Sequence, residues 1–286
     1  MRSLILLLFT IAVVQAAVPP DKMEAVRGML RDHKLAAAES AAKALVAANP
    51  TEAAAHALLA SVCVAKSDPD AAVTAGEKAV ALAPTSSEYQ LQLGDTYGFA
   101  AQKAGMFGKI GWAKKSRLAY EKAVEFDPAN VAARDSLMSF YQMAPGVMGG
   151  GADKAYAQAA EIKKLDANGG RVAYAKLYIG EKKYAEAFAE LDEVLRVAPD
   201  CYPAVFQFGR LTALSGQRVD AGMEALKKCL TLAPTPGAPG HDAAHWRMGN
   251  LWEKKGDKVA ARAAYTAALA LNPGFPQAID SLKKLD

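Results

Sequence analysis

The stretch that decides the fold is HWRMGNLWEKKGDKVAARAAYTAALALNP, residues 245–273. Gly256 separates two segments whose composition favours helix, as expected for a turn between helices. Small residues lie at Gly249 in the first segment and at Ala261 and Ala268 in the second. Small side chains at fixed helical offsets allow two helices to pack closely. The stretch therefore predicts one pair of antiparallel helices.

The same pattern recurs along the chain with a period near 34 residues. Apolar helical segments end at similar prolines, namely Pro84, Pro128, Pro199, Pro234 and Pro273, with a looser example at Pro50. The interval is 34 residues from Pro50 to Pro84 and 35 residues from Pro199 to Pro234. A fixed period of this length indicates repeated structural units that stack on one another.

These units resemble the tetratricopeptide repeat, a helix-turn-helix unit of 34 residues. The resemblance extends over about residues 20–286, and the last unit matches the family pattern at several positions: Met248, Gly249, Trp252, Gly256, Ala261, Tyr265, Ala268 and Pro273. It implies an all-α fold, a right-handed α-solenoid whose first helices line a concave groove. One helix pair has too little surface to form a core alone, so stacking must supply it.

We expect about seven units and then a capping helix. The expected bounds are residues 19–52, 53–86, 87–130, 131–167, 168–201, 202–241 and 242–273 for the units, and 274–286 for the cap. The last segment places Ile279 and Leu282 on one helix face, with charged residues on the other. Such a helix would cover the otherwise bare face of the last unit.

The N-terminal residues 1–16 predict a secretory signal peptide. Arg2 precedes an apolar run from Leu4 to Val14, and small residues follow at Ala16. The run is shorter than the roughly 20 residues that a membrane span needs. We expect cleavage after Ala16 and export, most simply to a bacterial periplasm, with an uncleaved membrane anchor as the lesser alternative.

The charge of the chain excludes an ordinary nucleic-acid-binding surface. The 34 basic and 30 acidic residues give a formal net charge of only +4, and they are mixed along the sequence. The three cysteines are too few for a scaffold built on disulfides. Antiparallel packing would bring the ends carrying Cys201 and Cys229 together, so both a disulfide and two free thiols remain open.

The string HDAAH, from His241 to His245, resembles the zinc-protease motif HExxH, with Asp for Glu. In the repeat register, however, His241 lies in the loop before a helix, and Asp242 is expected in its first turn. The other histidines, His33 and His56, belong to the opposite end of the array. A metal-dependent enzyme is therefore only a remote alternative. We expect no catalytic residue, no metal site and no cofactor.

The third unit carries ten extra residues between its helices, because Pro84 and Pro128 lie 44 residues apart. Longer helices would carry four apolar residues towards a protruding tip: Met106, Phe107, Ile110 and Trp112. Two interpretations remain open. The tip packs with Val147 and Met148 in a small core, or it forms an exposed apolar and basic patch for a partner or a lipid surface.

The expected groove offers a second candidate surface. The family resemblance places the fifth, sixth and ninth positions of each first helix on this surface. Near the C-terminus these positions supply basic, aromatic and amide side chains: Lys176, Phe206, Gln207, Arg210, Trp246, Arg247 and Asn250. Arginine and tryptophan together on a concave surface favour binding over an ordinary solvated face.

These features predict a protein–protein interaction scaffold of the bacterial cell envelope, not an enzyme. The expected ligand is a protein or peptide segment, held in the groove, with an acidic group that the arginines would bind. The alternative is an accessory subunit of an envelope assembly or secretion complex that docks through the tip of the third unit. Nucleic acid is not an expected partner, and membrane contact is not the first expectation.

Overall fold

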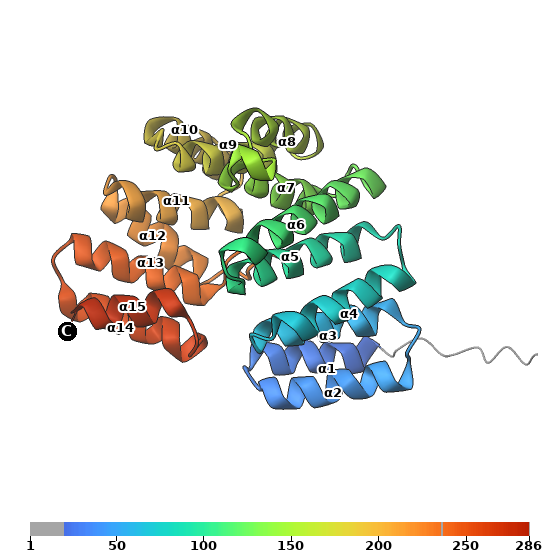
Figure 1. The fold of residues 1–286 in the computed structure, drawn as a ribbon. Helices are drawn as coiled ribbons and strands as arrows, with labels where there is room; N and C mark the ends of the chain where they lie inside the picture. Colours follow the sequence, from blue (N-terminus) through green and yellow to red (C-terminus); the bar gives the residue numbers. More distant parts are fainter. Residues whose placement is uncertain (1–19, 236, 286) are drawn as a thin grey trace, which may run out of the picture. The chain divides into compact units, whose positions relative to one another are not determined.

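The computed structural model describes residues 20–235 and 237–285, and in these ranges it contains fifteen α-helices and one short 3-10 helix (Figure 1). The predicted fold class, an all-α array of stacked helix pairs, is confirmed. The predicted signal peptide lies outside the described residues. The chain divides into an N-terminal body that ends at Trp112 and a C-terminal body that begins at Ala113.

The N-terminal body consists of consecutive helices that pack on their neighbours in sequence. They are α1 Pro20–Arg31, α2 Leu35–Ala48, α3 Ala53–Ala65, α4 Pro69–Leu82, α5 Ser87–Lys103 and the first residues of α6 Met106–Phe126. Small and branched side chains of α1, α2 and α3, among them Val26, Ala42 and Val62, form a buried cluster. Burial of this shared apolar surface is what holds one hairpin to the next.

The C-terminal body continues the same construction. After the end of α6 come α7 Val131–Met143, the 3-10 helix Gly146–Met148, α8 Ala152–Leu165, α9 Ala167–Gly180, α10 Tyr184–Val197, α11 Tyr202–Ser215, α12 Val219–Cys229, α13 His241–Lys254, α14 Lys258–Leu271 and α15 Pro276–Leu285. Alternate helices also meet, since α9 contacts α7 and α11, and α11 contacts α13. We call α7, α9, α11 and α13 the A helices of this body.

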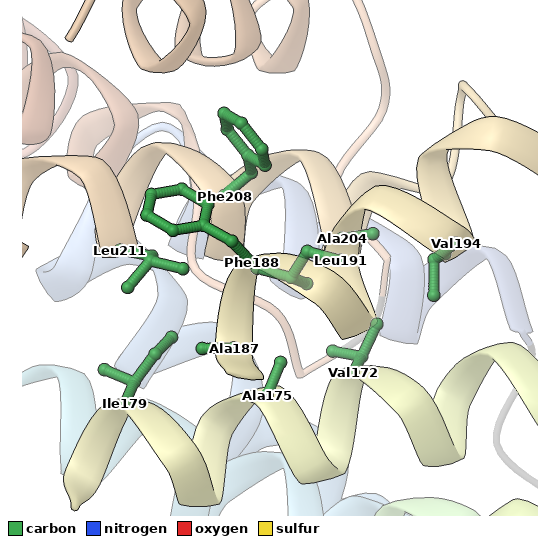
Figure 2. Close-up of a cluster of buried hydrophobic side chains, with 10 residues drawn as sticks. All are labelled: Val172, Ala175, Ile179, Ala187, Phe188, Leu191, Val194, Ala204, Phe208 and Leu211. Carbon is green, nitrogen blue, oxygen red and sulfur yellow. The ribbon is translucent and has the colours of Figure 1, made fainter. Parts of the chain in front are cut away.

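Figure 2 shows how the core passes from one helix pair to the next. Val172 and Ile179 of α9 lie beneath Leu191 of α10, and side chains of α11 continue the cluster. The rings of Phe188 and Phe208 meet edge to face with centroids 5.3 Å apart. Each pair therefore buries apolar surface that it could not bury by itself.

Glycine allows the closest helix approaches. A Cβ atom at Gly249 of α13 would lie 2.2 Å from the ring of Tyr265 on α14. One at Gly209 of α11 would lie 2.4 Å from the side chain of Leu226 on α12. The small residue in the recurring sequence pattern therefore has a direct steric cause.

Side-chain caps fix the start of several helices. Asp68 is the N-cap of α4, and its Oδ1 accepts a hydrogen bond from the backbone N–H of Ala71 at 3.1 Å. Pro69 follows at the first helical position, where its missing N–H costs nothing. Asp257 caps α14 in the same way, through the N–H of Ala260 at 2.8 Å. These caps define where α4 and α14 begin.

Within residues 20–235 and 237–285, no helix is both long enough and apolar enough to cross a membrane. The thiols of Cys201 and Cys229 are free, so the disulfide left open by the sequence is not formed. Cys229 is fully buried, and this burial raises the pKa of its thiol to about 12. It therefore behaves as a core side chain.

Candidate partner-binding faces

The C-terminal candidate residues lie on three neighbouring A helices. Lys176 belongs to α9, Phe206, Gln207 and Arg210 to α11, and Trp246, Arg247 and Asn250 to α13. The contacts between α9 and α11 and between α11 and α13 bring these helices side by side. We call this surface the A-helix face. Its members differ sharply in what they can offer a ligand.

Two of the predicted residues belong largely to the protein interior. Phe206 is 3% exposed and packs in the core shared by α11, α12 and α13, while Gln207 is 8% exposed. The expectation that Phe206 presents an accessible ring is therefore wrong. Its side chain supports the face from beneath, and Gln207 contributes by accepting a hydrogen bond from Arg210 at 3.0 Å.

Lys176 already has a partner. Its ammonium donates hydrogen bonds to both carboxylate oxygens of Asp135 on α7, at 2.7 and 2.6 Å. The backbone oxygen of Lys176 also accepts a hydrogen bond from Gln142 of α7. Asp135 therefore neutralises the charge of Lys176, and the ion pair links two A helices. With its charge already paired, Lys176 is poorly placed to attract a ligand.

Arg210 and Arg247, which we call the arginine pair, are different. Both side chains are half-buried, and neither has a carboxylate partner among residues 20–235 and 237–285. Burial lowers the pKa of Arg210 below its ordinary value. Burial, followed by repulsion from Arg210, lowers the pKa of Arg247 to about 10. Neither guanidinium group therefore points freely into solvent.

The contacts of Arg247 leave part of its hydrogen-bonding capacity unused. Its guanidinium lies 4.0 Å from the ring centroid of Trp246, a cation–π geometry. Its Nη1 donates only a long bond of 3.4 Å to Asn250, and its buried Nε has no partner in the described chain. A planar donor group held in this state is suited to bind a carboxylate or another oxyanion.

Trp246 and Asn250 are fixed by neighbouring elements. The indole Nε1 donates to Ser281 of α15 at 3.1 Å, and the ring meets Phe275 edge to face. Asn250 donates to the hydroxyl of Tyr265 at 2.9 Å. The ring beneath Arg247 is thus held in place before any ligand arrives. Sequence reasoning missed Ser281 because it lies 35 residues from Trp246.

HDAAH occupies the entrance of α13, although His241 is its first helical residue and not part of the loop. The Nε2 atom of His241 lies 2.9 Å from the carbonyl oxygen of Leu232, and Asp242 accepts a hydrogen bond from Asn272. Burial lowers the pKa of His245. In the part of the chain that the structure describes, no three His, Cys, Asp or Glu side chains are grouped as metal ligands.

The third-unit residues form a second candidate surface at the turn from α5 to α6. Met106 is 81% exposed, Phe107 93% and Ile110 48%. In the C-terminal body, Val147 is 89% exposed. Trp112 behaves differently, because its ring stacks on Tyr97 of α5 with centroids 5.7 Å apart. Met106, Phe107 and Ile110 are thus exposed at the start of α6, whereas Trp112 packs on α5.

Comparison with known proteins agrees with this architecture. A family model described as "Tetratricopeptide repeat" matches residues 242–275. No curated protein matches the chain in sequence. A tetratricopeptide repeat protein from Parabacteroides merdae has a similar structure, with a TM-score of 0.61 and 15% identity over 93% of this chain and 97% of that chain.

Two further solved structures show the same fold. Yeast Tom70 aligns with a TM-score of 0.60 and 15% identity over 94% of this chain and 53% of its own. A thermophilic TPR protein of Thermus thermophilus aligns with a TM-score of 0.53 and 18% identity over 73% of this chain and 98% of its own. At these identities the likeness concerns the fold alone.

Proposed function

We propose that this chain, which has the tetratricopeptide-repeat fold and a matching repeat at residues 242–275, is a protein–protein interaction scaffold and not an enzyme. The architecture supports this function because stacked helix pairs expose long helix faces to a partner. A likeness of fold does not by itself assign a ligand, because the side chains of the binding surface determine which ligand it recognises.

The arginine pair is the observation that supports a specific binding mode. The other arginines of the C-terminal body include Arg171, Arg196 and Arg218, and each of these forms an ion pair with a carboxylate. Arg210 and Arg247 instead repel each other while partly removed from water. A bound anionic group would offset this repulsion and satisfy the donors of Arg247.

The proposed ligand is an extended protein segment with a carboxylate, lying along the A-helix face of α11 and α13. A carboxylate would accept two parallel hydrogen bonds from one guanidinium. The indole of Trp246 would contact an adjacent apolar side chain of the ligand. Because the site uses few side chains, we expect affinity in the micromolar range that weakens as salt is added.

Peptide libraries with free and amidated C-termini test this mode by fluorescence polarisation. The best carboxylate peptide should bind wild-type protein, and Arg210→Gln or Arg247→Gln should weaken it about tenfold or more. Arg196→Gln is the matched control, since Arg196 already forms an ion pair with Glu193. If Arg247→Gln binds as tightly as wild type at low salt, the A-helix face is not the ligand site.

The proposal includes the cellular place predicted from the sequence, namely export to the envelope after cleavage behind Ala16. The apolar run from Leu4 to Val14 supports this location. N-terminal sequencing of protein expressed with its own leader should find Ala17 as the first residue in an envelope fraction. Intact Met1 in a cytosolic fraction would contradict export without affecting the binding proposal.

A further inference from the structure

The second surface carries an inference that does not depend on the A-helix face. The start of α6 presents Met106, Phe107 and Ile110 to solvent, with Lys109 on the same helix and Lys103 at the end of α5. We call these five residues the α5–α6 tip. Large apolar side chains that are this exposed and contiguous in sequence indicate a site of contact.

The surroundings of the tip are open. A Cβ atom added at Gly105 or at Gly111 would meet no heavy atom within 4 Å. Met106 and Ile110 are four residues apart on α6 and so lie on one side of the helix, with Phe107 next to Met106. Met106 and Phe107 thus project almost uncovered from the start of one helix, and about half of Ile110 is exposed beside them.

Charge around the tip has a single sign. From Thr96 to Tyr120 the sequence contains five basic residues and no Asp or Glu. Lys103 and Lys109 have no carboxylate partner within residues 20–235 and 237–285; Lys103 instead lies 5.6 Å from the ring centroid of Phe99. Positive charge beside projecting apolar side chains complements an apolar layer bordered by anionic groups, the arrangement of an anionic lipid surface.

We propose that the α5–α6 tip binds reversibly to the surface of a membrane that contains anionic lipids. Phe107, Met106 and Ile110 enter the boundary between headgroups and acyl chains, while the flanking ammonium groups contact lipid phosphates. A small convex tip suits this role better than a stable protein interface, which buries about 800 Å² on each partner. No part of the proposal requires the helix to cross the bilayer.

Vesicle flotation tests the proposal with the full chain. Wild-type protein should float with vesicles of phosphatidylcholine and phosphatidylglycerol, bind pure phosphatidylcholine vesicles much less, and be released by high salt. Phe107→Ser should weaken binding to the mixed vesicles about tenfold. The reason is that the substitution removes the aromatic side chain that inserts into the lipid, and with it most of the apolar contact. Lys109→Glu should weaken it about fivefold or more.

Val259→Ser is the matched control, because Val259 is 82% exposed on α14, outside the tip. It should bind like wild type, and all three variants should keep the wild-type melting temperature because their side chains are exposed. Failure of the wild type to float with anionic vesicles would overturn the proposal, as would undiminished binding by Phe107→Ser. Capture of a protein partner that requires Phe107, without vesicle binding, would assign the tip to that protein instead.

Discussion

At the scale of single residues, the arginine pair is a place where stability and ligand binding should oppose each other. Its two guanidinium groups are half-buried and mutually repulsive. Functional sites often keep such unfavourable charges because a ligand compensates them. Arg210→Gln should therefore leave the free energy of unfolding unchanged or raise it by up to about 1 kcal/mol, as measured by urea denaturation. A loss of more than about 2 kcal/mol would show that Arg210 is structural.

Tyr265 should make the protein sensitive to alkaline pH. Burial, with a hydrogen bond to Glu253, raises the pKa of its hydroxyl from 10.0 to about 12. Because the folded state holds this proton more tightly, its stabilising contribution is complete below pH 10 and is lost between about pH 10 and 12. The contribution is at most about 3 kcal/mol.

Tyr265→Phe should make the fall of stability with pH shallower, at the cost of about 1 kcal/mol near neutrality for the lost hydrogen bonds. Urea denaturation at a series of pH values measures both effects. An unchanged slope between pH 10 and 12 would show that other groups cause the alkaline loss.

Gly249 and Gly111 provide a matched pair of glycine substitutions. Gly249→Ala would press a methyl group against the fully buried ring of Tyr265, so we expect a loss of about 1–3 kcal/mol. Gly111 lies in a helix with open space at its Cβ position, so Gly111→Ala should be neutral or stabilising by up to about 1 kcal/mol. Thermal melting compares the two. Equal effects would contradict the role of close helix approach.

At the scale of helices, Asp68 and Asp70 should differ in their contribution to stability, because only Asp68 caps a helix. Asp68 is the N-cap of α4, and its side chain accepts a hydrogen bond from the backbone N–H of Ala71. Asp70 lies in the first turn, where its side chain contributes only a negative charge. Asp68→Ala should cost about 1 kcal/mol, and Asp70→Ala about 0.3 kcal/mol. Differential scanning calorimetry resolves this difference. A larger effect of Asp70→Ala would mean that the helix dipole outweighs the cap.

The helices also show why the fold was predictable while the details of the face were not. Helix pairing follows from a local pattern, small residues at fixed offsets, and Gly249 and Gly209 have the contacts that this pattern implies. The exposure of Phe206 depends on how α12 and α13 cover α11. The ion pair of Lys176 depends on a carboxylate 41 residues away. Neither the covering helix nor the distant partner can be read from the periodicity of one segment.

At the scale of the molecule, each helix contacts few others, nearly all of them near in sequence. Stability should therefore be distributed over hairpin interfaces, and damage should remain local. Leu191→Ala in the core of α9, α10 and α11 should cost about 2–5 kcal/mol. Hydrogen exchange measured by mass spectrometry should be faster in the Leu191→Ala variant than in the wild type in α9, α10 and α11. The exchange of α1 to α3 should be unchanged by the substitution. A uniform increase along the chain would indicate one global cooperative unit.

The nearest-neighbour packing of helix pairs also has a mechanical consequence. Tension applied to the two ends of such a chain is carried in series, so every hairpin interface bears the same load. The weakest interface yields first, and the others remain folded until the load rises again. A partner bound along α11 and α13 would contact two adjacent helix pairs at once. Its binding would therefore raise the force needed to separate these two pairs and leave the other interfaces unchanged.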